Sequence, residues 1–111
     1  MAGYDGGKTW TLTEMDGAPF GATATLIFGD KGKVVGQAPC NKYFTTQTLP
    51  YPWIKLEAIG STRMACPDLD KETAYFDALI EMTEAEVSGD IMILRNDAGR
   101  ELVFKAASDD G

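Results

Sequence analysis

Apolar and polar residues alternate in several short segments of this chain, and this period of two constrains the fold more than any other feature. Trp10 and Leu12 alternate with threonines, and Leu26 and Phe28 alternate with polar or β-branched neighbours after a turn. Successive side chains of a strand point to opposite faces, so this pattern places apolar groups on one side of a sheet. Further strands are predicted at 33–37, 40–47, 54–56, 84–88, 91–95 and 100–105. The chain therefore predicts about seven to eight short strands joined by tight turns.

One helix interrupts the strands. It is predicted to begin near Pro67, with Asp68 or Asp70 as the acceptor at its N-cap. Its apolar residues recur at helical spacing and are predicted to face the core, and they are Leu69, Phe76, Leu79 and Ile80. Strands on both sides of a lone helix indicate the α+β class, with a small antiparallel barrel or curled sheet that the helix plugs or flanks.

At 111 residues the chain is long enough for one hydrophobic core and too short for two. We therefore expect one domain over 1–111, with a folded core of about 8–105. The predicted core residues lie on the apolar phase of their own elements, and they are Trp10, Leu12, Leu26, Phe28, Ile54, Leu56, Phe76, Leu79, Met92, Leu94, Leu102 and Phe104.

Composition argues against several functions. The formal net charge is −7 and no Lys or Arg run offsets it locally, so nucleic acid is not an expected partner. No apolar run approaches the roughly 20 residues that cross a bilayer. The absence of histidine removes Ser-His and Cys-His nucleophile pairs and most metal sites, and the acidic clusters lack the order of a calcium loop. We expect no catalytic, cofactor or metal site.

Cys40 and Cys66 have three interpretations: a structural disulfide, two buried thiols or a reactive pair. An even cysteine count in a small domain that can be exported favours the disulfide. Such a bridge would stabilise the domain by about 3.5 kcal/mol through chain entropy.

Other polar and aromatic residues are weighed in the same way. Arg63 with Ser61 and Thr62 could bind an anion, but a lone Arg more often pairs with a carboxylate or covers backbone carbonyls. Asn41 is predicted to satisfy backbone groups of its own turn. The aromatic residues near the Pro-rich turn favour packing in the core or at an edge, and the alternative is an exposed binding surface of Tyr43, Tyr51 and Trp53.

Two motifs carry a resemblance to a known family. A Trp-x-Leu strand is followed by Cys40-Asn41-Lys42-Tyr43 and by the segment Ser61 to Cys66, which reads Ser-Thr-Arg-Met-Ala-Cys. In this combination the chain resembles the META domain, also called the HslJ-like family. The matching motif positions are Trp10, Asn41, Tyr43, Ser61, Thr62, Arg63 and Met64. The chain departs from the family pattern at Pro39 and at Phe44, where members commonly have glycine nearby.

The resemblance implies a cracked β-barrel, an association with envelope stress and drug resistance, and neither a cofactor nor a known catalytic residue. The function expected from it is that of a non-enzymatic envelope-associated binding or structural module. Its partner would be a protein or a small apolar ligand held in the barrel seam. The alternative is a small enzyme using carboxylate or cysteine chemistry. A periplasmic or envelope location follows from the resemblance alone, since the chain carries no export signal. A cytoplasmic location is therefore not excluded, and neither is a lipid anchor outside this chain.

Overall fold

The computed structural model describes residues 8–29, 32–62 and 64–106, which form nine strands and one helix. Two of these strands, at 18–19 and 57–61, were not predicted, and the predicted strand at 54–56 is not formed. In chain order the elements are β1 (Trp10–Met15), β2 (Ala18–Pro19), β3 (Thr25–Phe28), β4 (Lys33–Gln37), β5 (Lys42–Thr46), β6 (Glu57–Ser61), α1 (Leu69–Glu81), β7 (Glu84–Ser88), β8 (Ile91–Arg95) and β9 (Glu101–Ala106).

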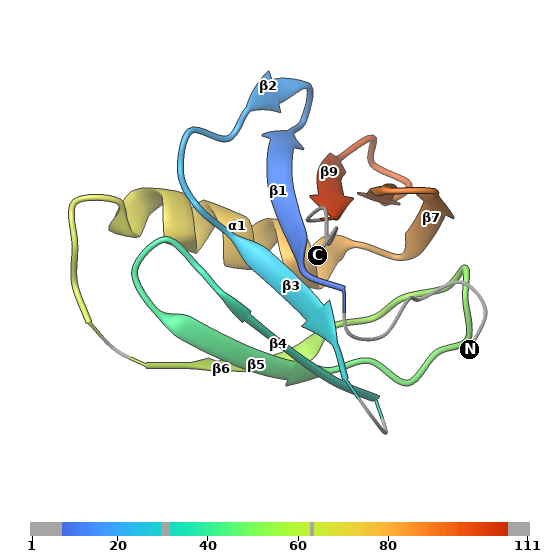
Figure 1. Cartoon of the computed structure of the whole chain (residues 1–111), viewed down its shortest axis with the longest axis horizontal. Coiled ribbons are helices and arrows are strands. Elements are labelled where there is room, and N and C mark those ends of the chain that lie inside the picture. Colours follow the sequence, from blue (N-terminus) through green and yellow to red (C-terminus); the bar gives the residue numbers. More distant parts are fainter. Residues whose placement is uncertain (1–7, 30–31, 63, 107–111) are drawn as a thin grey trace.

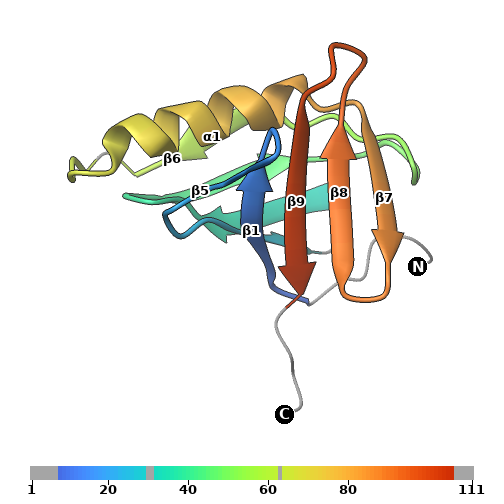
Figure 2. The same cartoon turned by 90° about the horizontal axis from the view of Figure 1, so that it is seen from above.

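All strands belong to one antiparallel sheet with the order β6-β5-β4-β3-β1-β9-β8-β7, and β2 pairs with β1 alone. The sheet curls but does not close, so β6 and β7 are its two edges. Figures 1 and 2 show α1 lying against this curled sheet. The α+β class and the curled antiparallel sheet are therefore confirmed, in the form of an open sheet and not a closed barrel.

The first hairpin shows how local sequence sets a turn. β1 and β2 pair through Met15 and Ala18, which leaves Asp16 and Gly17 as a two-residue connection. Their φ angles are 53° and 87°, the left-handed region that glycine and, less readily, aspartate adopt. Asp-Gly is therefore one of the dipeptides that suit this turn.

The predicted core is buried with one exception. Phe76 is only partly buried and packs against the edge of the core, whereas its neighbour Tyr75 is fully buried. Trp10 is also fully buried, and its indole N–H has no hydrogen-bond partner among the described residues. The last strand reaches Ala106, which is buried, so the folded unit extends one residue past the predicted 105.

The predicted core face of the helix is right for Leu79, which is buried, but wrong for Leu69 and Ile80. Leu69 and Ile80 are 41% and 53% exposed, and the helix buries Glu72, Tyr75, Ala78 and Leu79. The face turns because Glu72 finds three N–H donors inside the fold and the Tyr75 ring fills its centre. The buried side of the helix therefore includes one charged residue, Glu72, because the hydrogen bonds of its carboxylate are satisfied there.

Two local predictions also need correction. Asp68 is the N-cap of α1 but its side chain makes no capping bond; its backbone carbonyl accepts from the N–H groups of Lys71 and Glu72. Ile54 and Leu56 are buried as predicted, but they do not form a strand. Their segment crosses from the β7 edge, where Trp53 bridges Glu84, to the start of β6.

Candidate functional site

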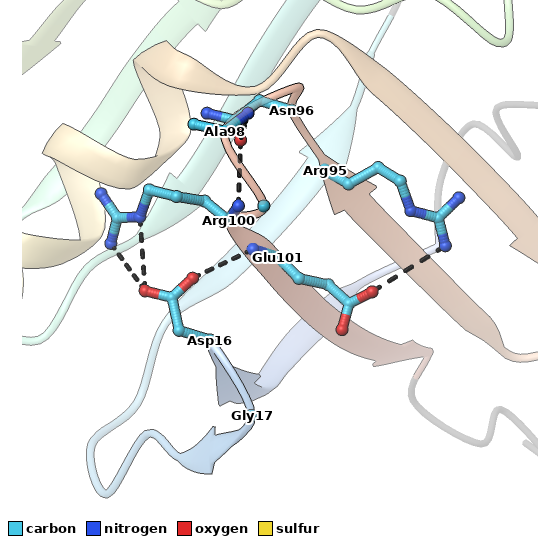
Figure 3. A pocket seen from close by; sticks show the side chains of 8 residues that line it. Asp16, Gly17, Arg95, Asn96, Ala98, Arg100 and Glu101 are labelled. Atoms are coloured by element: carbon cyan, nitrogen blue, oxygen red, sulfur yellow. Dashed lines mark hydrogen bonds and ion pairs between the residues drawn. The ribbon is translucent and has the colours of Figure 1, made fainter.

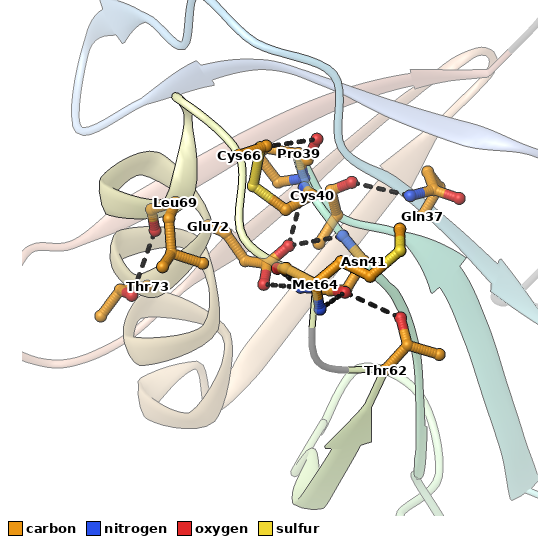
Figure 4. Close-up of a disulfide and its surroundings, with 11 residues drawn as sticks. Gln37, Pro39, Cys40, Asn41, Thr62, Met64, Cys66, Leu69, Glu72 and Thr73 are labelled. Atoms are coloured by element: carbon orange, nitrogen blue, oxygen red, sulfur yellow. Dashed lines mark hydrogen bonds between the residues drawn. A yellow bond between two sulfur atoms is a disulfide. The ribbon is translucent and has the colours of Figure 1, made fainter.

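The two cysteines meet at the junction of the two motifs. Cys40 precedes β5, Cys66 precedes α1, and they form a disulfide with their Cα atoms 5.7 Å apart (Figure 4). The disulfide interpretation is confirmed. Neither sulfur is a free thiol, so the reactive-pair alternative has no thiolate to use.

Asn41 ties three segments together beside this disulfide. Its Oδ1 accepts from Met64 N at 2.7 Å and from the Thr62 hydroxyl at 2.9 Å, and its Nδ2 donates to Met64 O and to Glu72 Oε2 (Figure 4). Asn41 does satisfy backbone groups as predicted, but they belong to Met64 and not to its own turn, and its other partners are the side chains of Thr62 and Glu72. These partners lie 21 to 31 residues away, and a single sequence gives no signal for such a contact.

Glu72 completes the junction from the helix. Its side chain is only 4% exposed, and Oε1 accepts from the backbone N–H groups of Cys40 and Asn41, both at 2.8 Å. Glu72 thus differs from its acidic neighbours Asp68 and Asp70, which are exposed. Its position on the same helical face as Tyr75 and Leu79 was the signal that could have identified it.

The second motif is used in the same junction. Ser61 ends β6 opposite Tyr43, and Thr62 gives its hydroxyl hydrogen to Asn41. Met64 bonds through its backbone, while its side chain is 64% exposed. Arg63 lies outside the described residues, so no contact of the described residues tests the interpretation that it binds an anion.

Tyr43 points into the core, so the favoured packing interpretation is confirmed for this residue and the alternative of an exposed binding surface is wrong for it. Its hydroxyl donates to Thr25 O at 2.6 Å and lies 2.7 Å from the Tyr75 hydroxyl. Burial raises the pKa of both phenols well above the usual value, so both stay neutral. Gly36 makes room for this pair, because a Cβ there would lie 2.7 Å from the Tyr43 hydroxyl.

Tyr51 and Trp53 cover the β7 edge. The Tyr51 hydroxyl accepts from Val87 N at 3.0 Å, Pro52 O accepts from Ala85 N at 2.7 Å, and Trp53 forms a bridge with Glu84. Both rings are nevertheless partly exposed. Their structural role is to block a sheet edge, and a role in binding stays a prediction.

A pocket of about 460 Å³ lies between the β1–β2 and β8–β9 turns (Figure 3). Asp16 Oδ2 accepts from Nε and Nη2 of Arg100 at 3.3 and 3.0 Å, while Oδ1 accepts from Glu101 N. These hydrogen bonds lower the pKa of Asp16, and the carboxylate in turn raises the pKa of Arg100.

The cations of this pocket already have carboxylate partners. Arg100 also lies 3.6 Å from Glu81 at the end of α1, and Arg95 pairs with Glu86 at 3.1 Å and with Glu101 at 3.9 Å. The arrangement joins the first turn, β9 and the end of the helix. Its chemistry is that of a structural ion-pair network at the surface.

Across residues 8–29, 32–62 and 64–106, no group of three or more Cys, Asp or Glu side chains is arranged to hold a metal ion. In the same part of the chain, no helix has the length and apolar character that crossing a bilayer requires.

Comparison with known proteins places this fold. An NMR structure of a protein from Burkholderia xenovorans is 26% identical, with a TM-score of 0.76 and coverage of 93% of this chain and 83% of that one. A second NMR structure is 21% identical, covers 88% and 87% of the two chains and has a TM-score of 0.68. The crystal structure of a DUF4847 family protein from Bacteroides vulgatus ATCC 8482 is 10% identical, covers 87% and 90%, and has a TM-score of 0.67. The latter two show the fold alone, and no functionally curated protein matches the chain. The sequence model of the META domain matches residues 5–109, nearly the full length, and the chain therefore belongs to the META domain family.

Proposed function

We propose that this META domain is a non-enzymatic binding module of the bacterial cell envelope, acting through a protein partner. The observation that carries the proposal is the disulfide between Cys40 and Cys66 at the centre of both motifs. Disulfides persist in oxidising compartments such as the periplasm and are rare in the cytosol.

The use of the polar groups supports binding over the enzyme alternative. Carboxylate or thiol chemistry needs a group that can reach a substrate. Here the cysteines are bridged, the Glu72 carboxylate accepts three N–H groups, and Asp16 is held by Arg100. These groups stabilise the fold.

The distribution of apolar side chains supports a protein partner over a small apolar ligand. Large side chains such as Trp10, Tyr75 and Phe104 fill the inside of the curled sheet and are fully buried. Phe44, in contrast, is 58% exposed on the outside of β5. Its cross-strand neighbour Val35 on β4 is also exposed, and adjacent exposed apolar groups of this kind suit a surface that another protein covers.

The test is the thiol state of the full-length gene product in its native host. Cells are treated with a maleimide reagent of known mass before lysis and fractionated. We expect the protein in the envelope fraction, with Cys40 and Cys66 unlabelled unless a reductant is added first. A Cys66→Ser variant is the control, because its remaining Cys40 must label if the reagent reaches it. A cytosolic protein with two labelled thiols would contradict the proposal.

A further inference from the structure

The two edges of the sheet are treated differently. At one edge, Tyr51 and Pro52 accept hydrogen bonds from β7 and Trp53 bridges Glu84, so the strand is covered by its own chain. At the other edge, β6 ends the strand order, and no strand within the described ranges pairs with its outer side. An uncovered edge is a template for another strand.

The hydrogen-bonding direction of β6 shows which groups it offers. Thr62 N donates to Lys42 O, so Thr62 faces β5. Backbone groups of an antiparallel strand alternate in direction, so the N–H and C=O groups of Ser61 and the C=O group of Ile59 point away from β5; beyond this point the register of β6 shifts, between its pairs with Phe44 and Thr46. These two residues present the outer edge to an incoming backbone.

An apolar stripe of the helix lies next to this edge. Leu69, Phe76 and Ile80 share one side of α1, adjacent to the buried side, and the first and last are well exposed. The Phe76 ring lies 5.4 Å from the Tyr43 ring, and Tyr43 pairs with Ser61, so the stripe is on the β6 side. In Figure 1 α1 lies above β6, across the interior of the curled sheet, and in Figure 2 the two elements overlap along the line of sight.

The two surfaces have matching lengths. From Leu69 to Ile80 the helix rises about 16 Å at 1.5 Å per residue. The five residues of β6 extend over about 14 Å. One extended segment can therefore contact the edge and the apolar stripe along their whole length.

The charge around this surface specifies its partner. Of the carboxylates on α1 and at its N-cap, Asp68, Asp70 and Asp77 are exposed, whereas Glu72 is buried and Glu81 pairs with Arg100. Two of these exposed carboxylates, Asp70 and Asp77, belong to α1. They lie about a quarter turn around the helix from the apolar residues, on the side away from the core. An approaching segment with Lys or Arg between its apolar residues would complement this rim.

We propose that β6 and the apolar stripe of α1 bind an extended, basic and apolar segment of a partner protein. The segment adds a strand to β6 through the outward groups of Ile59 and Ser61. Its apolar side chains cover Leu69 and Ile80, and its basic side chains meet Asp70 and Asp77. This inference rests on the proposed binding role but not on the proposed compartment.

The test uses the purified, oxidised domain and a blocked heptapeptide of alternating Lys and Val as the probe. We expect saturable binding in an NMR titration, with slower amide hydrogen exchange at Ser61. A peptide of alternating Glu and Val should not bind. Ile80→Ser should weaken the Lys-Val peptide about tenfold, whereas Ile91→Ser, a matched exposed position on β8, should leave its affinity unchanged.

A second variant addresses the edge itself. Ser61→Pro removes one outward N–H and is compatible with an edge strand, so it should weaken binding of the Lys-Val peptide while the domain stays folded. Absence of saturable binding, or self-association of the domain through β6, would overturn the inference. Binding that instead protects residues around Trp53 would also overturn it, yet would leave the binding role standing. The thiol-labelling experiment is independent of all these outcomes.

Discussion

The strongest stability prediction concerns Glu72. Replacing it with Ala removes three hydrogen bonds of 2.8 Å, from Cys40 N, Asn41 N and Asn41 Nδ2, inside a nearly closed site. Hydrogen bonds to a charged group contribute about 1.5–3 kcal/mol each, but bonds that share one carboxylate are not additive. The donors left behind remain buried. We expect Glu72→Ala to lower the free energy of unfolding by about 3–5 kcal/mol.

Glu72→Gln separates the hydrogen bonds from the volume of the side chain. Gln keeps one oxygen for the two backbone N–H groups, but its amide nitrogen then faces the Asn41 Nδ2 donor. Asn41 cannot turn over without cost, because its Oδ1 already accepts from Thr62 and Met64. We expect an intermediate loss of about 1–3 kcal/mol.

The measurement is urea unfolding of the oxidised protein, followed by the fluorescence of Trp10 and Trp53. Asp77→Asn is the control, because it neutralises an exposed carboxylate on the same helix and should change stability by less than about 0.5 kcal/mol. The slope of free energy against urea must stay constant for the comparison. If Glu72→Gln costs no more than Asp77→Asn, the buried carboxylate does not hold the junction and the reasoning is refuted.

Three further outcomes are expected. Tyr75→Ala should cost about 3–5 kcal/mol in the same urea assay and exceed Phe76→Ala, because only Tyr75 is fully buried; equal losses would contradict the assigned helix face. Reduction of the Cys40–Cys66 disulfide should lower stability by about 3.5 kcal/mol, measured as the change in unfolding free energy with and without reductant, and an unchanged value would contradict a structural role. The folded-state pKa of Asp16 lies below its ordinary value of 3.8, so the stability that its carboxylate contributes is complete above pH 3.8 and is lost as pH falls through the folded-state pKa. Asp16→Asn should therefore flatten the dependence of the unfolding free energy on pH below about pH 4. An unaltered pH profile would argue against the contact between Asp16 and Arg100.

Local patterns predicted most of the strands correctly. Alternation around Leu26, Met92 and Leu102 identified β3, β8 and β9, because a period of two follows from strand geometry and not from the neighbours a strand finds. The helix was found for the same reason, from the 3.6-residue recurrence of apolar groups. The disulfide was favoured by the cysteine count, and the structure pairs the same two residues.

The residues between regular elements were harder to place. The segment with Ile54 and Leu56 has the alternation of a strand, yet it packs in the core without pairing as one. Tyr51 and Trp53 stand beside prolines in the sequence, and nothing local shows that they cover β7, which lies more than 30 residues away.

The sequence by itself determined the class of the fold, its single helix and the cysteine pair, since these depend on local periodicity and composition. Only the tertiary structure decided which side of α1 is buried. Two apolar stripes compete on that helix, and the choice depends on whether Glu72 meets the N–H groups of Cys40 and Asn41. Burial is a property of contacts between distant segments, so one helix can have the right period and still present the unexpected face.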